Sequence, residues 1–196
     1  MASRSLFCAQ IAPSARTIAL SLLVESFDSE EGVDVLLERA LAQSSFDGRE
    51  RALTVELTYG VLRRLATIDW RLGPALDKPL LRLPVAVQMV LRLGAYQLLF
   101  LDRIPQSAAV NESVNLARAF TGRLGRDWSG FVNAVLRAFL RHPPQPWPSM
   151  DPDAAQALAV RYSIPGWLCR RWVEYLGVAS AEAACEGVSV APPLTL

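Results

Sequence analysis

The sequence is short of the residues that most often build metal sites and catalytic centres. Its 196 residues include a single histidine, His142, and three cysteines that stand far apart: Cys8, Cys169 and Cys185. No pair of them has the spacing of a zinc site, and one histidine beside two prolines gives no support for a catalytic triad. Nothing suggests a disulfide framework. We therefore expect no metal ion and no catalytic residue in this chain.

Glycine-rich phosphate-binding loops and long uninterrupted apolar runs are missing as well. We therefore assign no cofactor-binding residue. The most apolar segment, 83–101, contains Gln88, Arg92 and Gln97, and three such polar groups are costly in lipid. The first dozen residues are too short and too weakly apolar for a signal peptide. The sequence predicts a cytoplasmic protein that makes no membrane contact.

Charge is nearly balanced overall but unevenly distributed. The net charge is +1, which gives no global argument for nucleic-acid binding. Residues 30–60 carry a net charge of −4, whereas residues 61–141 carry 12 basic and five acidic residues, a net of +7. Such clustering predicts one positive face that attracts phosphate. The predominance of arginine over lysine is equally expected from a GC-rich genome, so only the clustering counts.

Strand signals are scarce and helical periodicity runs through most of the chain, which predicts an all-α fold. In the first helix Leu20, Leu23, Val24 and Phe27 are expected to face inward. A third helix should start after the N-cap Asp47, with Glu50 completing a capping box, and should place Gly60 on its polar side. The expected helices are Pro13 or Ser14 to Phe27, 33–43, 48–66, 68–76, 83–101, 107–120, 128–141, 152–162, 165–176 and 180–188.

The chain divides at a proline-rich segment. Residues 143–152 contain five prolines, which is typical of a linker. We expect a disordered N-terminus over 1–11, a helical bundle over 12–142, and a small helical linker subdomain over 152–190.

One face of the predicted helix 128–141 carries the strongest candidate binding residues. Arg126, Asn133, Arg137 and Arg141 follow one another at helical spacing, opposite an apolar stripe. Such a row can follow a phosphate backbone, with bidentate contacts from arginine and a neutral hydrogen bond from asparagine. The alternative is a solvated face whose arginines pair with the acidic residues of 30–60. Both interpretations stay open at the level of sequence.

Three further arginines are candidates for RNA binding. Arg63 and Arg64 end the third helix, where cations also stabilise a helix through its dipole. Arg16 lies in the first turn of the first helix, where a cation is slightly unfavourable, so we expect a ligand or partner there. The aromatic residues are expected to pack in the core or in interfaces rather than to stack on bases.

Five phrases, taken in order, resemble one family. They are ARTIALSLL (15–23), TYGVLRR (58–64), LRLGAYQLLFLDRIPQSAAVNESVNLA (91–117), FVNAVLRAFLR (131–141) and SIPGWLCRRWVEYLG (163–177). Together they resemble the N-terminal region of the RsmB/Sun family, methyltransferases that modify carbon 5 of a cytosine in 16S ribosomal RNA.

The resemblance implies a NusB-like RNA-binding domain over 12–142, followed by a linker subdomain that leads into a catalytic domain. That domain binds S-adenosylmethionine and carries two catalytic cysteines, and we expect it to be absent from this chain. Cys8, Cys169 and Cys185 do not match its motifs, so we expect no methyl transfer from this chain alone. The implied partners are 16S rRNA and the downstream methyltransferase domain.

Two other functions remain possible at this stage. A stand-alone NusB-like adaptor in transcription antitermination would bind RNA and a ribosomal protein. A purely structural domain would only support the catalytic half, and its residues 152–196 would dock there.

Overall fold

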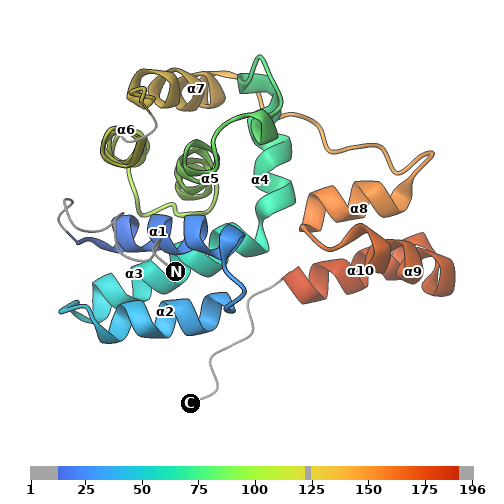
Figure 1. Cartoon of the computed structure of the whole chain (residues 1–196). Helices are drawn as coiled ribbons and strands as arrows, with labels where there is room; N and C mark the ends of the chain where they lie inside the picture. The colour runs from blue at the N-terminus through green and yellow to red at the C-terminus, as the bar shows by residue number, and fades with distance from the viewer. Residues whose placement is uncertain (1–12, 122–124, 190–196) are drawn as a thin grey trace.

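The computed structural model describes residues 13–121 and 125–189 and places them almost entirely in helices (Figure 1). Within these ranges there is no β-strand, so the predicted all-α fold is confirmed. The expected disordered segment 1–11 lies outside the described residues. The helices are α1 (Ala15–Asp28), α2 (Val33–Ala42), α3 (Gly48–Arg63), α4 (Leu65–Leu72), α5 (Val85–Phe100), α6 (Gln106–Thr121), α7 (Ser129–Arg141), α8 (Ala154–Tyr162), α9 (Gly166–Leu176) and α10 (Val178–Ser189), with short 3-10 turns η1 (Gly73–Ala75) and η2 (Leu80–Arg82).

Polar residues start several of these helices by capping free backbone N–H groups. Ser14 and Thr17 form a reciprocal capping box at the start of α1. Asp47 accepts the backbone N–H groups of Arg49 and Glu50 at α3, as predicted. The Glu50 carboxylate, however, accepts the backbone N–H of Ala15 at 2.7 Å, so it joins the start of α3 to the start of α1. The local sequence contains no signal for that contact.

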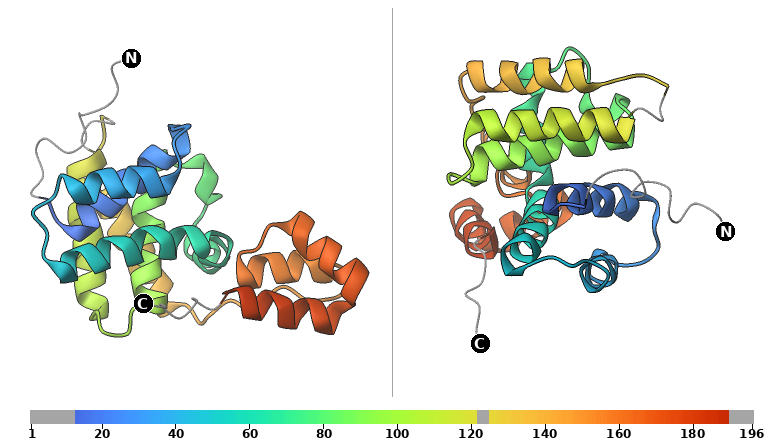
Figure 2. Two further views of the ribbon diagram at one scale, coloured as in Figure 1. Left: turned by 90° about the horizontal axis from the view of Figure 1, so that it is seen from below. Right: turned by 90° about the vertical axis from the view of Figure 1, so that its left-hand side faces the viewer.

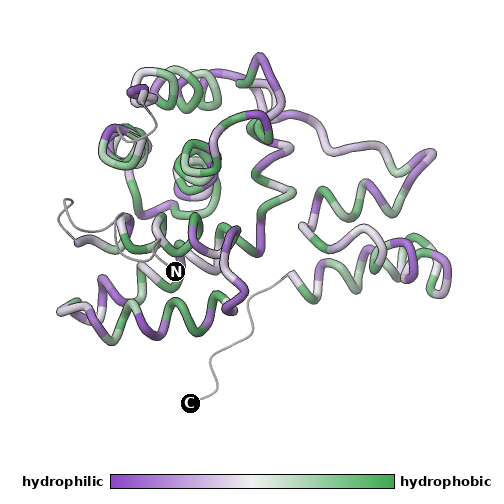
Figure 3. Tube along the Cα trace, in the orientation of Figure 1, coloured by the Kyte–Doolittle hydropathy of each residue, from purple (hydrophilic) through white to green (hydrophobic). Residues whose placement is uncertain are grey.

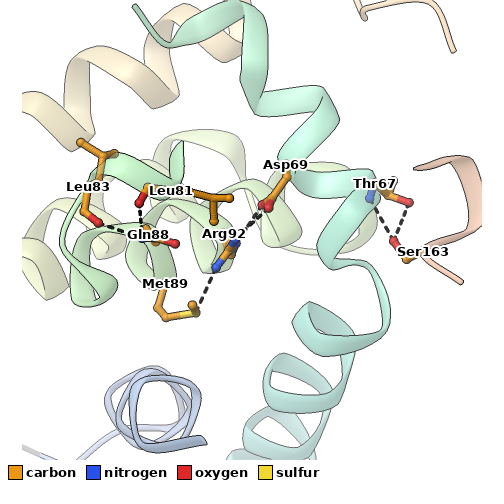
Figure 4. Close-up of polar contacts among 8 residues, drawn as sticks. All are labelled: Thr67, Asp69, Leu81, Leu83, Gln88, Met89, Arg92 and Ser163. Atoms are coloured by element: carbon orange, nitrogen blue, oxygen red, sulfur yellow. Dashed lines mark hydrogen bonds and ion pairs between the residues drawn. The ribbon is translucent and has the colours of Figure 1, made fainter. Parts of the chain in front are cut away.

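Helix α5 is the centre of the larger bundle and is buried all round from Ala86 to Gln97. Its polar side chains are satisfied inside the protein (Figure 4). The Arg92 guanidinium donates to both carboxylate oxygens of Asp69 on α4, at 2.8 and 2.7 Å, and Gln88 donates to the Leu83 carbonyl. A buried charge needs such a partner. Within the described residues, no helix is long and apolar enough to cross a membrane.

The other helices of the bundle expose a polar side, and hydropathy alternates along most of them (Figure 3). Two expectations about these faces were wrong. Phe27 is 49% exposed, in the last turn of α1. Gly60 is buried rather than polar-facing, since the Tyr96 ring of α5 lies directly against it. The third helix also stops at Arg63 instead of Ala66, and α4 begins after a break at Arg64.

Helices α8–α10 form a second, smaller group with a buried cluster of its own (Figures 1 and 2). Its centre includes Leu158, Cys169, Ala181 and Cys185, all fully buried. Burial raises the pKa of the Cys169 thiol to about 12, so this thiol stays protonated at neutral pH. The residues between α7 and α8 run in an extended path without helix, as the prolines predict.

The two groups meet along one side of α4. The Thr67 backbone N–H donates to the Ser163 hydroxyl at 2.9 Å (Figure 4). The Thr67 hydroxyl donates to the Val160 carbonyl at 3.0 Å. Ser163 adopts a left-handed backbone conformation, with φ of 56°, at the end of α8. One turn further along α4, Trp70 donates to the Pro146 carbonyl and Arg71 lies 4.0 Å over the Trp147 ring. We call this set of contacts the α4 junction.

Candidate nucleic-acid interface

The outer face of α7 carries three of the seven predicted binding residues, and a fourth, Arg126, lies just before the helix. The helix buries Val132, Val135 and Leu136 against α5 and α6. Arg137 and Arg141 are exposed on the other side, and Asn133 is half-buried beside them. The Arg137 Nε donates to the Asn133 Oδ1 at 2.8 Å, so the amide orients the guanidinium. Strong amphipathicity, visible in the sequence, fixes which side of this helix faces outward.

Arg126 extends this row past the start of the helix. Its guanidinium lies 4.5 Å from the centroid of the Trp128 ring, which holds it in place, and Trp128 packs edge-on against Phe131. Between them, Asp127 accepts the backbone N–H of Ser129 at 2.8 Å, and this hydrogen bond lowers the pKa of the Asp127 carboxyl. We refer to Arg126, Asn133, Arg137 and Arg141 as the α7 row.

The arginines of the α7 row are not neutralised by acidic side chains. Among residues 13–121 and 125–189, no carboxylate lies within 4.0 Å of Arg126, Arg137 or Arg141. The suggested pairing with acids of 30–60 is therefore wrong. Two of those acids have other partners: Glu31 pairs with Arg39 on α2, and Glu56 accepts the hydroxyl of Tyr96.

Arg16 has a structural partner of its own. Its Nε donates to the Oε1 of Gln97 on α5 at 2.8 Å, and the Gln97 amide donates to the Leu93 carbonyl. Gln97 is almost fully buried, so the arginine satisfies an oxygen that water does not reach. This contact accounts for a cation in the first turn of α1 without a ligand.

Arg63 and Arg64 lie at the end of α3, on the other side of the bundle from α7 (Figure 1). Arg63 is exposed and lies 5.6 Å from the Tyr59 ring centroid. Arg64 donates to the Ser189 carbonyl at the end of α10, at 2.9 Å, and lies over the Phe100 ring. A cation at a helix C-terminus is stabilising. Because Ser189 ends α10, the hydrogen bond from Arg64 joins the two groups of helices, and we count it among the contacts of the α4 junction. The structure does not bring this pair together with the α7 row.

A neighbouring group of polar side chains lies on α6. Asn111, Asn115 and Arg118 are all exposed and follow one another at helical spacing. Arg118 is close enough to the start of α7 that its charge helps to lower the pKa of Asp127. In the sequence, Asn111, Glu112 and Asn115 lie on one side of this helix and could bind a base edge, but hydrogen bonding to loop backbone within the bundle is the favoured interpretation. Both asparagines are exposed on the surface. The spacing of 111, 115 and 118 is the signal that identifies this exposed face.

This arrangement defines an all-helical bundle with an outward, cationic helix and, among the described residues, no group of His, Cys, Asp and Glu side chains able to hold a metal ion. The chain belongs to the NusB family, whose model matches residues 13–141. The α7 row lies at the end of the matched region.

Its relatives are ribosomal RNA small subunit methyltransferases B. The probable enzyme of Bacillus subtilis is 33% identical over 185 residues, covering 93% of this chain and 40% of the relative. That of Thermus thermophilus is 38% identical over 169 residues, covering 85% of this chain and 37% of the relative. The chain thus spans about two fifths of the length of these relatives. The resemblance to this family is confirmed.

The fold also matches a solved structure. The crystal structure of PH0851 superposes with a TM-score of 0.69 over 93% of this chain and 40% of that chain. The two sequences are only 15% identical, so this similarity concerns the fold alone.

Proposed function

We propose that this chain is the RNA-binding N-terminal region of an S-adenosylmethionine-dependent 16S rRNA (cytosine-C5) methyltransferase, working in the cytoplasm. It engages ribosomal RNA and is not itself catalytic. The observation that carries the proposal is the α7 row. Its three arginines are exposed and have no carboxylate partner among the described residues, in a chain related to small subunit methyltransferases. Methyl transfer belongs to the region of the relatives that this chain does not cover.

The described residues do not fit S-adenosylmethionine. Nucleotide-type cofactors of the Rossmann class bind at the carboxyl ends of parallel strands, beside a glycine-rich turn. Residues 13–121 and 125–189 contain no strand. The described cysteines, Cys169 and Cys185, are fully buried, and burial raises the pKa of both thiols. The role of this chain is therefore to bind and position RNA.

The spacing of the α7 row suits a polyanionic backbone. Four residues of helix rise about 6 Å, so Asn133, Arg137 and Arg141 follow one another at about that interval along α7. Arginine binds phosphate oxygens through two parallel hydrogen bonds, and Asn133 holds the Arg137 fork in one orientation. Arg126 and Arg118 add positive charge at the start of the helix. Contacts of this kind fix the position of RNA without reading its sequence.

A charge reversal tests the proposal. Arg137→Glu should weaken binding of a labelled 16S rRNA fragment severalfold at low salt, measured by fluorescence anisotropy. The slope of log affinity against log salt should fall by about 0.7 for each phosphate that the variant no longer neutralises. The matched control is Arg49→Glu, the same charge change at an exposed site in the first turn of α3. Equal losses of affinity for both variants, or RNA affinity that does not depend on salt, would contradict the proposed interface.

The adaptor function has less support. The relatives align with up to 93% of this chain, well beyond the residues 13–141 that the NusB model matches, so α8–α10 belong to the methyltransferase-type sequence. A stable complex with a ribosomal protein, isolated by affinity purification of this chain, would favour the adaptor instead.

A further inference from the structure

The turn between α9 and α10 leaves neighbouring apolar side chains uncovered. Leu176 is 51% exposed and Val178 is 42% exposed. Gly177 stands between them in a left-handed backbone conformation, with φ of 76°, and makes the turn. Tyr175, next to Leu176, is 75% exposed. We call Tyr175, Leu176 and Val178 the α9–α10 patch.

Two members of the patch continue the buried sides of their helices. Leu176 follows Cys169 by seven residues and Val173 by three, and both of those pack in the core of the small subdomain. Val178 precedes the fully buried Ala181 by three residues. Residues at these spacings share one side of an α-helix. Leu176 and Val178 therefore lie on core-facing sides whose cover stops short of the turn.

The helical bundle does not extend to the patch. Ser189, at the opposite end of α10, is the residue that accepts the hydrogen bond from Arg64. From Val178 to Ser189 the helix rises about 16 Å, so the turn lies far from that contact. In Figure 1 α10 runs from the right-hand end of the molecule back toward the bundle. Whatever covers the patch therefore comes from outside helices α1–α7.

The chemistry of the patch favours a protein occupant over RNA. Residues 152–189 carry three basic and four acidic residues, a net charge of −1, and Glu174 borders the patch. Such a surface does not attract a polyanion. Neighbouring exposed apolar side chains mark a surface for protein contact, and tyrosine is enriched in protein interfaces.

The relatives indicate which protein segment that is. Helices α8–α10 lie beyond residues 13–141 of the NusB match, but the alignment to the Bacillus subtilis relative covers 93% of this chain. This chain in turn covers only 40% of that relative, and the superposition on PH0851 has the same two proportions. In both proteins the subdomain thus occurs together with a much longer stretch of polypeptide. A segment of the same polypeptide is present at high effective concentration, so even a small apolar patch suffices to bind it.

We propose that the α9–α10 patch is the docking surface for the part of the full-length methyltransferase that this chain does not cover. That part buries Leu176 and Val178 and completes the small core of α8–α10. The inference rests on the proposed function, because it takes this chain to be a region of a longer methyltransferase, but it does not depend on RNA binding. Docking there fixes how the RNA-binding bundle is oriented relative to the catalytic region.

The test is a chimaera in which this chain replaces the 40% of the Bacillus subtilis relative to which it aligns. Hydrogen exchange followed by mass spectrometry compares residues 173–181 in the chimaera and in the isolated chain. Exchange there should be about tenfold slower or more in the chimaera, because burial of aliphatic side chains stabilises the turn against local opening. Exchange in α2 should be the same in both proteins.

The double variant Leu176→Asp with Val178→Asp should return exchange in the chimaera to the rate of the isolated chain. Both sites are exposed, so the isolated double variant should keep its helical circular dichroism spectrum. Val35→Asp, at a 50% exposed site on α2, is the matched control and should leave the protection in place. In the intact Bacillus subtilis relative, aspartates at the positions aligned with 176 and 178 should have the same effect, which tests the proposal without a chimaera.

Each other outcome overturns the proposal. Equal exchange of residues 173–181 in the chimaera and the isolated chain means that the catalytic region does not cover the patch, and protection that survives the double variant places the docking surface elsewhere. Without protection in the chimaera, dimers of the isolated chain that the double variant abolishes would assign the patch to a second copy. Protection by a 16S rRNA fragment alone would assign it to RNA. If the chain binds no RNA but the chimaera is protected, the RNA-binding role fails and the docking surface stands.

Discussion

Single side chains decide how closely α3 and α5 approach each other. A Cβ at Gly60 would overlap the Tyr96 ring, whose hydroxyl donates to Glu56 one turn earlier on α3. Burial and the neighbouring Glu56 carboxylate both raise the pKa of Tyr96, so its hydroxyl remains a donor at every physiological pH. The glycine is therefore required by packing, since its backbone is ordinary helix.

Gly60→Ala should destabilise the chain although alanine favours helix. The rigid ring of Tyr96 has to move, and overpacking of this kind typically costs about 1–3 kcal/mol. The gain in helix propensity is only about 1 kcal/mol. Urea denaturation followed by circular dichroism measures the difference. Gly187→Ala on α10, where an added Cβ meets no atom within 4 Å, is the control and should be neutral or stabilising. If both variants gain stability, the close approach of Tyr96 is not limiting.

At the scale of elements, local signals identified the helices and failed where distant contacts decide. Amphipathic spacing and the caps at Ser14 and Asp47 are local, so the sequence predicts where α1 and α3 begin. The outward face of α7 is predictable for the same reason. Arg64 resembles a free cation in the sequence, because its partner, the Ser189 carbonyl, is 125 residues away in the chain. Arg16 does so as well, since its partner Gln97 lies on another helix.

The start of α7 carries an acidic side chain that would oppose RNA binding at the proposed interface. Asp127 accepts the Ser129 N–H, and this hydrogen bond lowers its pKa, so the carboxylate remains ionised beside Arg126 and Arg118. Asp127→Asn keeps an acceptor for the Ser129 N–H, because the asparagine side chain retains a carbonyl oxygen. It removes one negative charge beside the α7 row.

We expect Asp127→Asn to bind the rRNA fragment about two- to fivefold more tightly at low salt, with the gain shrinking as salt screens the charge. Fluorescence anisotropy at two salt concentrations measures the change in affinity, and an unchanged melting temperature shows that the start of α7 is intact. Asp34→Asn, on α2 in the acidic part of the chain, is the control for a change of net charge alone. Weaker binding, or an equal gain in the control, would place the RNA elsewhere.

At the scale of the whole molecule, two separately buried groups of helices are held by polar contacts. The cluster of α8–α10 is small, with only seven buried apolar residues at its centre. A group of this size gains little stability from its own core. The α4 junction therefore stabilises it, through Thr67 and Ser163, the Arg71–Trp147 stack and the Arg64–Ser189 hydrogen bond.

Thr67→Val tests whether the junction holds the subdomain. Valine has the shape of threonine but leaves the Val160 carbonyl and the Ser163 hydroxyl without this partner, which costs about 1–3 kcal/mol for a buried pair. Hydrogen exchange followed by mass spectrometry should show faster exchange in α8–α10, with α5–α7 unchanged. Thr58→Val is the matched control, because the Thr58 hydroxyl donates within α3 to Thr54 and lies away from the junction. A subdomain that is held only by the junction must open before the bundle does. Uniformly faster exchange along the whole chain would therefore contradict this prediction, because it would mean that the two groups of helices unfold as one unit.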